Sequence, residues 1–235
     1  MDKELVFTGA FRNSNWFWKK YWYNGGNGRY SSFQTTLNLL NQLTKDPVII
    51  ETGCQRLPDD IGGGMSTSIF AEYIHRYNGS IYTVDIDMKN LSMAKACVDN
   101  INPNLEIEYC ASDSVEWLSN YRGPSPDLLY LDSWDYPIFE IAKNYHPDFA
   151  TAEKKMWELD PNIFIKQYYN EIKDCQNHCV NEFDAIKHKL KDSTILLLDD
   201  NLLPGGGKPR LLKEILPDMG WICLLDLQQS LWIRK

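Results

Sequence analysis

Short apolar runs alternate with amphipathic segments along most of the chain after residue 47. Apolar runs bounded by glycine, proline or acidic residues are typical of strands, and apolar residues spaced three and four apart indicate helices. This alternation predicts an α/β fold with a Rossmann-like, mostly parallel sheet, helices on both faces, and a C-terminal antiparallel hairpin. Strands are expected at 48–50, 81–84, 105–109, 128–131, 194–198, 221–225 and 231–233, and helices at 31–44, 69–77, 91–98, 114–118 and 209–216.

Two segments depart from this alternation. Residues 1–30 gather tryptophans and tyrosines before a break rich in glycine and asparagine, and we interpret them as an aromatic N-terminal arm. Such an arm either packs on the domain or a second subunit, or covers the substrate site and stacks on a sugar ring. Packing is the commoner use of aromatic clusters. The segment at about 134–191 is too long for a plain crossover, and we interpret it as an insertion whose front part is a lid or substrate wall.

The rear of this insertion carries apolar residues at three- and four-residue spacing from Pro161 onward, which predicts one long helix. Its cysteines, Cys175 and Cys179, could join His178 and His188 in a zinc site. Both cysteines lie on the apolar stripe, however, so packing in the core is the favoured interpretation.

The first candidate site lies between the strand at 48–50 and Asp85. Glu51 and Gly53 end that strand, and a glycine run at 62–64 precedes the helix that leads to the second strand and Asp85. Glycines let the backbone approach a cofactor closely, and an acid about 20 residues further on can bond ribose hydroxyls. A pyrophosphate disfavours nearby carboxylates, whereas the ammonium and sulfonium of S-adenosylmethionine favour them. The alternative is a turn that only connects strand to helix.

The second candidate site joins Asp132, which follows the strand at 128–131, to Asp200 and Asn201, which follow the strand at 194–198. These strands should be neighbours, so the three side chains are expected to converge. Two carboxylates and an amide oxygen suit Mg²⁺, which could bind substrate oxygens and lower the pKa of a hydroxyl. The alternative is that Asp132 caps a helix and the later acids form a polar turn.

Composition narrows the range of functions. A length of 235 residues fits a single domain spanning 1–235. The net charge of −8, with no Lys/Arg-rich run, argues against nucleic acid and anionic membranes as partners. No apolar run approaches a membrane span, no signal-peptide pattern is visible, and six scattered cysteines suggest reduced thiols in a cytoplasmic protein. We therefore expect a small-molecule substrate, with a homo-oligomer left possible.

These motifs resemble those of class I S-adenosylmethionine-dependent methyltransferases, in particular the metal-dependent catechol and antibiotic-sugar O-methyltransferases, over about residues 47–201. Leu131-Asp132-Ser133-Trp134 is similar to that family's Leu-Asp-His-Trp after strand four, and Asp200-Asn201 to its Asp-Asn metal pair. Ala111-Ser112-Asp113 matches its Ala-Ser-Gln, and Gly64-Met65-Ser66 falls where its Gly-Tyr-Ser contacts the methionine moiety.

The resemblance implies roles for individual residues. Glu51 is expected near the amino-acid end of the cofactor, Asp85 on the ribose, and Trp134 against the adenine ring. The implied cofactor-binding residues are Glu51, Gly53, Gly64, Met65, Ser66, Asp85, Ser112, Asp113, Asp132 and Trp134.

The sequence also departs from the family pattern. The glycine turn carries an insertion at 55–61, and the family's catalytic lysine, three residues after the metal-binding acid, is Asp135 here. The general base is therefore expected to be Asp135, or His146 from the lid. The longer lid makes a sugar or other polyol at least as plausible an acceptor as a catechol.

Together these observations predict an O-methyltransferase that uses S-adenosylmethionine and Mg²⁺ or another divalent cation. Two alternatives stay open. A dinucleotide-dependent oxidoreductase is disfavoured by the acidic turn. A non-catalytic binding protein that kept the fold would account for the missing lysine.

Overall fold

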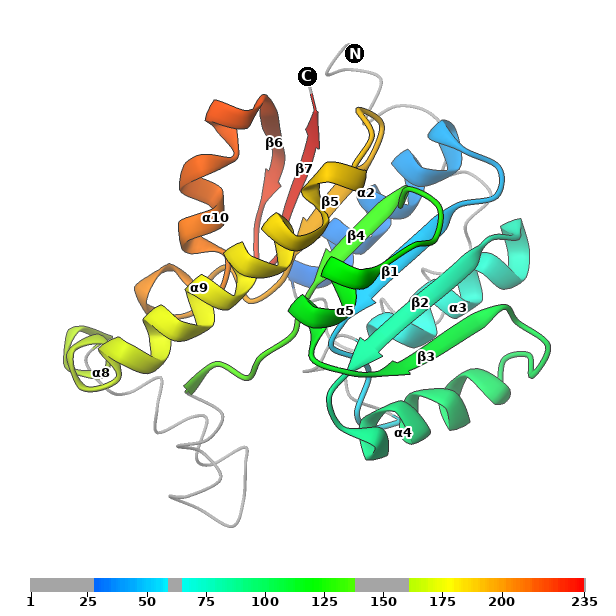
Figure 1. The fold of residues 1–235 in the computed structure, drawn as a ribbon, viewed down its shortest axis with the longest axis horizontal. Coiled ribbons are helices and arrows are strands. Elements are labelled where there is room, and N and C mark those ends of the chain that lie inside the picture. The colour runs from blue at the N-terminus through cyan, green and yellow to red at the C-terminus, as the bar shows by residue number, and fades with distance from the viewer. Residues whose placement is uncertain (1–27, 59–64, 138–160, 235) are drawn as a thin grey trace.

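The computed structural model describes residues 28–58, 65–137 and 161–234, and its centre is a seven-stranded sheet (Figure 1). The strand order is β3-β2-β1-β4-β5-β7-β6. The first five strands are parallel, and β7 runs antiparallel between β5 and β6. The strands are β1 (Val48–Thr52), β2 (Ser80–Asp85), β3 (Ile107–Ala111), β4 (Leu128–Leu131), β5 (Ile195–Leu198), β6 (Trp221–Asp226) and β7 (Ser230–Arg234).

Helices cover both faces of this sheet, so the predicted fold class is confirmed (Figure 1). The predicted elements all form, with ends shifted by a few residues. The α-helices are α2 (Gly28–Leu43), α3 (Ser66–Tyr77), α4 (Met88–Asp99), α5 (Ser114–Asn120), α8 (Pro161–Gln167), α9 (Tyr169–Ile186) and α10 (Arg210–Ile215), and the short 3-10 helices are η4 (Lys187–Lys189), η5 (Pro204–Gly206) and η6 (Pro217–Met219).

The expected long helix after Pro161 is two helices, not one. Tyr168 has φ −112° and ψ 30°, which breaks the chain into α8 and α9. Phe164 on α8 and Ile172 on α9 still pack in one apolar cluster with Tyr136, so the apolar stripe is buried on both sides of the break. The spacing of apolar residues therefore predicted the buried face correctly and missed the bend.

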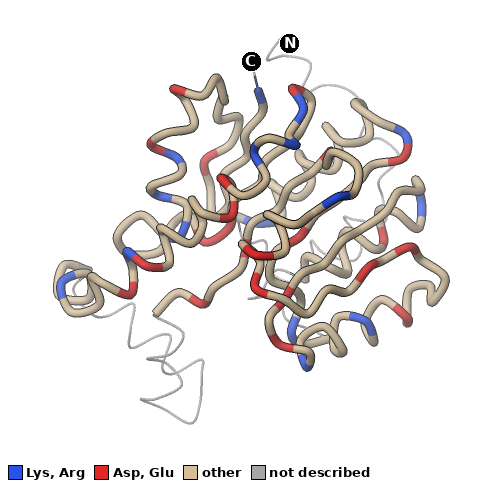
Figure 2. Tube along the Cα trace, viewed as in Figure 1, with Lys and Arg blue, Asp and Glu red and all other residues tan. Residues whose placement is uncertain are grey.

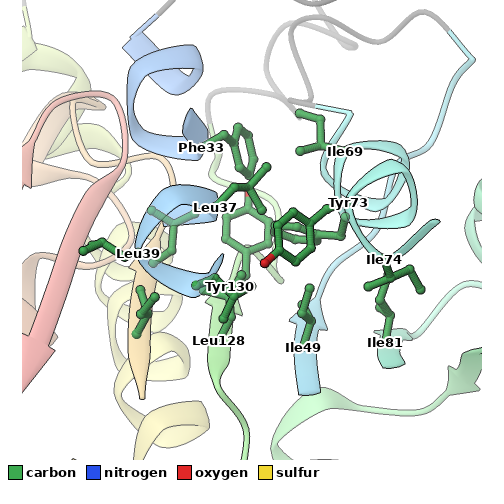
Figure 3. Close-up of a cluster of buried hydrophobic side chains, with 14 of the residues drawn as sticks. Phe33, Leu37, Leu39, Ile49, Ile69, Tyr73, Ile74, Ile81, Leu128 and Tyr130 are labelled. Atoms are coloured by element: carbon green, nitrogen blue, oxygen red, sulfur yellow. The ribbon is translucent and has the colours of Figure 1, made fainter. Parts of the chain in front are cut away.

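One face of the sheet packs against α2 and α3. Ile49, Leu128 and Tyr130 point from the strands toward Phe33 of α2 and Phe70 of α3, in a cluster drawn in part in Figure 3. The rings of Phe33, Phe70 and Tyr130 lie 5.6–5.7 Å apart, close enough for favourable aromatic contacts. Because strand side chains alternate, Glu51 lies on the same face as Ile49.

The other face packs against α5, α9 and α10. Leu129, Leu131 and Leu196 from the strands meet Phe183 of α9 and Leu212 of α10 in this second cluster. The rear part of the segment at about 134–191 is thus built into the core. Residues 1–27, which make up most of the predicted aromatic arm, and residues 138–160 of the predicted lid lie outside the described residues.

The parallel strands all end at one edge of the sheet, and this edge carries the polar residues. Thr52 of β1 is in register with Val84 of β2 and with Leu131 of β4, and Leu131 is in register with Leu198 of β5. The residues that follow these positions are therefore neighbours, as ligand sites in open α/β sheets require. Within the described residues, no helix is both long and apolar enough to cross a membrane.

Candidate functional site

A pocket of about 700 Å³ opens at the carboxyl ends of β1, β2 and β4. Its lining includes Gly53, Asp85, Ser112, Asp113 and Trp134, all of which the sequence placed near a cofactor. The structure thus brings together residues that are up to 81 positions apart, from Gly53 to Trp134. The rest of the lining includes four more acidic residues, Asp87, Asp135, Glu171 and Asp174, and one arginine, Arg56.

Gly53 shapes the floor of this pocket. Its φ is +74°, a conformation that favours glycine, and an added Cβ would lie 2.5 Å from the backbone oxygen of Asp132. The amide of Gly53 donates to the carbonyl of Val84 at 2.8 Å, which holds the end of β1 against β2. Glycine at this position therefore lets β1 and β4 end side by side and leaves the backbone open to the pocket.

Asp85 ends β2 and is 8% exposed. Its carboxylate accepts from the backbone amides of Cys54 at 3.2 Å and Asp87 at 2.8 Å, and from Asn90 Nδ2 at 3.2 Å. Neutral amide donors hold the side chain without neutralising it, so the carboxylate remains available to hydroxyl donors in the pocket.

Ser112 and Asp113 follow β3, as the sequence predicted, and Asp113 has a structural task as well. Its carboxylate accepts from the amide of Glu116 at 3.0 Å and caps α5. The hydroxyl of Ser112 donates to the carbonyl of Asp113 at 3.1 Å. Both residues line the pocket near the start of α5.

Trp134 stands at the pocket wall with φ +62° and is 51% exposed. Its ring lies 4.7 Å from that of His178, which comes from α9. The Nε2 atom of His178 lies 3.0 Å from the hydroxyls of both Ser114 and Ser133, and Ser133 donates to Glu182 at 2.6 Å. This polar cluster orients the ring of His178, which lies against Trp134.

His178 is a pocket residue that sequence reasoning placed elsewhere, in a candidate zinc site. Cys175 and Cys179, its neighbours on α9, are buried in two different apolar clusters. Within the described part of the chain, no group of three or more His, Cys, Asp or Glu residues could hold a metal ion. The sequence did hold a signal for this position. His178 precedes Cys179 directly, so on a helix it points to a different side from the apolar stripe that carries Cys175 and Cys179.

Glu51 is fully buried and does not line the pocket. Thr67 and Thr83 both donate to its Oε2 atom, at 2.8 and 3.0 Å. Its Oε1 atom has no hydrogen-bond partner among the described residues. Burial raises the pKa of Glu51 to about 7, and the hydroxyls of Ser66, Thr67 and Thr83 oppose that rise. An unpartnered carboxylate oxygen fits a cationic group arriving nearby.

Asp135, one of the two expected bases, lies in the pocket lining but is held in an ion pair. The guanidinium of Arg56 donates to its Oδ1 atom at 2.6 Å. Arg56 belongs to the insertion in the glycine turn, so this insertion reaches across to the strand-four loop. The other expected base, His146, and the cofactor-site residue Gly64 lie outside the described residues.

Met65 and Ser66, expected beside the methionine moiety, begin α3. Met65 has φ +48° and forms the N-terminal boundary of the helix, while Ser66 is buried. Neither is among the residues that line the pocket. Both follow the stretch at 59–64, which is outside the described residues.

The second candidate site is a buried network of charges at the ends of β4 and β5. Asp132 and Asp200 do converge, as predicted, but Lys208 lies between them. Its ammonium is 2.9 Å from Asp132 Oδ1 and 2.9 Å from Asp200 Oδ2. On the other side, Arg29 of α2 pairs with Asp199 at 2.8 Å and with Asp200 at 2.7 Å.

Asn201, the third expected metal ligand, faces away from this network. Its Nδ2 donates to Asp226 Oδ1 and to the carbonyl of Leu227, both at 2.6 Å. Its amide oxygen accepts from the ammonium of Lys213 at 2.5 Å. Asn201 therefore ties the end of β5 to the turn between β6 and β7, and does not converge with Asp132.

The electrostatics of the network follow from burial and from pairing. Burial would lower the pKa of Lys208, but the charges of Asp132 and Asp200 raise it well above its usual value. Arg29 and the hydroxyl of Tyr130 hold the pKa of Asp199 below its usual range, although burial opposes them. Both cations are thus charged, and the space between Asp132 and Asp200 holds an ammonium.

This donor set does not fit the expected divalent cation. Mg²⁺ needs oxygen ligands at about 2.0–2.1 Å in octahedral geometry. Here one carboxylate pair is bridged by an ammonium and the amide oxygen is bonded elsewhere. Gln229 also belongs to this network, since its Nε2 atom donates to Asp199 Oδ2 at 3.0 Å. The members that sequence reasoning missed are Arg29, Tyr130, Lys208 and Gln229.

Comparisons with known proteins support the fold. No family model matches the sequence, and no curated protein does. Among solved structures, an rRNA methylase from Streptococcus thermophilus is similar with a TM-score of 0.52 at 8% identity, covering 89% of this chain and 98% of that chain. A SAH-bound methyltransferase from Podospora anserina has a TM-score of 0.51 at 12% identity, covering 93% and 84%.

A third similar structure is named as an O-methyltransferase, the type of enzyme that the sequence predicted. The TDP-rhamnose 3'-O-methyltransferase of calicheamicin biosynthesis has a TM-score of 0.52 at 14% identity, covering 87% of this chain and 77% of that chain. Identities this low establish the fold alone. The chain has the class I S-adenosylmethionine-dependent methyltransferase fold, as its motifs predicted.

Proposed function

We propose that this chain is an S-adenosylmethionine-dependent O-methyltransferase that acts on a hydroxyl of a small molecule. The observation that carries the proposal is the acidic pocket at the strand ends of a methyltransferase fold, with Asp85 held by amides at the end of β2. When bound, the cofactor supplies an electrophilic methyl group on its sulfonium. The chain's own residues have to bind it, orient the acceptor and remove a proton.

The residues fit this cofactor piece by piece. Asp85 lines the pocket and would accept from the ribose hydroxyls. The contacts described above hold its carboxylate with neutral amide donors. Ser112, Asp113 and Trp134 form the adenine side, and the ring of His178 lies against that of Trp134. Glu51 is kept as the proposed partner of the ammonium end, on the ground that its buried Oε1 atom has no hydrogen-bond partner among the described residues.

A dinucleotide fits the same pocket poorly. A pyrophosphate needs bare amides or cations, and its charge would meet Asp85, Asp87 and Asp113 in the lining. Arg56 could offset that repulsion, but its guanidinium is already paired with Asp135. The charge pattern therefore favours the sulfonium cofactor over NAD.

The same charges favour a small acceptor over RNA, although one similar structure is an rRNA methylase. An RNA-binding surface would need a track of Lys and Arg along the site. In Figure 2 the basic residues are scattered over the chain, and the net charge is −8. A phosphate backbone would meet repulsion at this pocket, whereas a neutral hydroxyl compound would not.

Two residues are proposed for proton removal. Asp135 lines the pocket next to Trp134, and its pairing with Arg56 holds the carboxylate in place. His146 remains the alternative base. We do not include Mg²⁺ in the proposed reaction, because Lys208 bridges the acids that were expected to bind it.

Calorimetry with Asp85→Ala tests the cofactor assignment. Loss of charge-assisted bonds to the ribose should weaken S-adenosylmethionine binding by about 1.5–3 kcal/mol, or roughly 10- to 150-fold in Kd. The matched control is Asp99→Ala, because Asp99 is an exposed acid at the far end of α4 that pairs only at the surface with Lys95. Equal affinities for wild type and a folded Asp85→Ala protein would remove Asp85 from the site.

Turnover separates the enzyme from a binding protein with the same fold. Transfer of a labelled methyl group from S-adenosylmethionine to a panel of catechols, sugars and polyols should give product with at least one hydroxyl compound. Tight cofactor binding without transfer to any acceptor class would favour the non-catalytic alternative. Binding of NADH in place of S-adenosylmethionine would favour the oxidoreductase.

A further inference from the structure

Lys208 occupies a position built by the carboxyl ends of two adjacent strands. Its ammonium lies 2.9 Å from Asp132 Oδ1, 3.3 Å from the Asp132 carbonyl and 2.9 Å from Asp200 Oδ2. An ammonium has three donor hydrogens, so these three oxygens account for all of them. The side chain is 6% exposed and thus almost fully removed from solvent.

The loop that delivers Lys208 is shaped for close approach to β5. Gly207 has φ +70°, and an added Cβ would lie 1.8 Å from the carbonyl oxygen of Asp200. Any other residue there would push the loop, and with it Lys208, away from the strand end. From the other side, Gln176 of α9 donates to the carbonyls of Gly205 at 3.2 Å and Gly207 at 3.0 Å. The position of Lys208 is therefore fixed by the fold.

The charges around this position are close to balanced without a metal. Asp132, Asp199 and Asp200 bring three carboxylates, and Lys208 and Arg29 bring two cations that contact them directly. A divalent cation between Asp132 and Asp200 would have to displace the ammonium or lie against it. Either arrangement costs Coulomb energy in a site from which water is largely excluded.

We propose that the ammonium of Lys208 takes the place that a divalent cation would hold between Asp132 and Asp200, so that this chain holds its strand-four acid in position without a metal. Lys208 is a positioning residue in this account, since it acts through Asp132. The carbonyl of Asp132 packs against Gly53 in the pocket floor, so Lys208 also fixes the wall between the two sites. The inference does not rest on the proposed function, because it concerns which cation the acids hold.

Titration of the metal-free full chain with Mn²⁺, followed by the electron paramagnetic resonance of free Mn²⁺, tests the proposal directly. Wild type and Asp200→Asn should give superimposable curves, because Asp200 is already engaged by Lys208 and Arg29. Weak binding shared by both proteins would reflect the net charge of −8. One tightly bound Mn²⁺ in wild type that Asp200→Asn removes would overturn the proposal.

Thermal unfolding of Lys208→Met gives a second, independent test. Removing the ammonium leaves buried Asp132 without its cation and Asp200 with Arg29 alone, so Tm should fall by roughly 6–20 °C. Millimolar Mn²⁺ should recover part of that loss in Lys208→Met and leave wild type unchanged. The control is Lys187→Met, which removes an exposed lysine paired with Asp184 and should shift Tm by less than about 2 °C.

Each outcome of the second test bears on the proposal. A Lys208→Met protein as stable as Lys187→Met would show that Lys208 is not the counter-charge of these acids. If Lys208→Met is destabilised and Mn²⁺ does not change its Tm, the two acids form no cation site. The proposal that Lys208 takes the place of a divalent cation would then fail. If Lys208→Met does not fold, the Mn²⁺ titration of wild type and Asp200→Asn still decides. Neither measurement involves S-adenosylmethionine, so they can fail independently of the proposed function.

Discussion

Two acidic clusters lie side by side on one edge of the same sheet and differ in what meets their charge. Around the pocket, Asp85 is bonded by neutral amides and the cavity stays open. At the ends of β4 and β5, Asp132, Asp199 and Asp200 are met by cations from distant parts of the chain, Arg29 and Lys208. The first arrangement keeps a charge available for a ligand, and the second uses it within the fold.

The difference shows what decides between a binding site and a structural network. Asp85 in one cluster and Asp132, Asp199 and Asp200 in the other all lie at or just after the end of a parallel strand, so their local sequences look alike. The deciding feature is whether a buried lysine or arginine from another element reaches the carboxylates, and that depends on packing. Arg29 and Lys208 are 7% and 6% exposed, whereas Arg56, which pairs with Asp135 at the pocket, is 41% exposed. Removing a charge from the pocket should therefore affect cofactor binding or turnover. Removing a charge from the network at the ends of β4 and β5 should affect the stability of the fold.

The largest expected effect is on turnover, at the pocket. Asp135→Asn should lower kcat by roughly 10²–10⁴-fold if Asp135 is the general base, because the amide cannot accept the acceptor's proton. Cofactor affinity should change little, and this split is measured by combining turnover with calorimetry. Asp184→Asn, an exposed acid on α9, is the control. Unchanged turnover in Asp135→Asn would move the role of base to His146.

The next largest effect is on stability, in the charge network. Arg29→Met leaves Asp199 and Asp200 without their guanidinium and should lower the free energy of unfolding by about 3–5 kcal/mol. The exposed Arg122 serves as control, and Arg122→Met should change stability by less than about 0.5 kcal/mol. Urea unfolding measures both. Equal stabilities would mean that the network does not hold the fold together.

Glu51, which lies near the end of β1, allows a test of how stability depends on pH. Burial raises its pKa to about 7, so between pH 4.5 and 7 the native state keeps a proton that the unfolded state releases. The free energy of unfolding should therefore fall as pH rises through this window. Glu51→Gln should reduce that fall by about 2–3 kcal/mol, and Glu106→Gln, at an exposed position, should not.

Urea unfolding at pH 5 and pH 7.5, without cofactor, gives the slopes. Burial also raises the pKa of Asp132, so some slope should remain in both variants. A wild-type slope that Glu51→Gln leaves untouched would contradict the assignment of a raised pKa to Glu51.

The smallest effect is expected at Trp134. Its ring is half exposed beside His178, and Trp134→Ala should weaken S-adenosylmethionine binding by about 1 kcal/mol, roughly fivefold. Trp134→Phe keeps an aromatic face and should recover most of the affinity. Identical affinities in calorimetry for all three proteins would place adenine away from Trp134.

The fold could be predicted from the sequence because the spacing of apolar residues indicates which side chains are buried. The leucines of β4 and β5 are buried on both sides, and their short apolar runs are bounded by acids, which together indicate central parallel strands. The bend at Tyr168 was not readable, because the apolar spacing continues across it and is satisfied by two helices as well as by one.

The pocket was also largely readable, since Gly53, Asp85, Ser112 and Trp134 each follow a strand end. The charge network was only half readable. Its acids were found, but Arg29 and Lys208 reach them from α2 and from a loop after β5. One signal was present and unused: three consecutive glycines, 205–207, stand directly before Lys208 and let it approach Asp200.

One measurement tests the central claim, that the pocket takes the cofactor while the neighbouring acids need no metal. Chelator-treated full chain is titrated calorimetrically with S-adenosylmethionine, first in EDTA and then in Mg²⁺. We predict one cofactor bound per chain, with the same affinity in both conditions. No binding in either condition, or binding that appears only with Mg²⁺, would contradict the account.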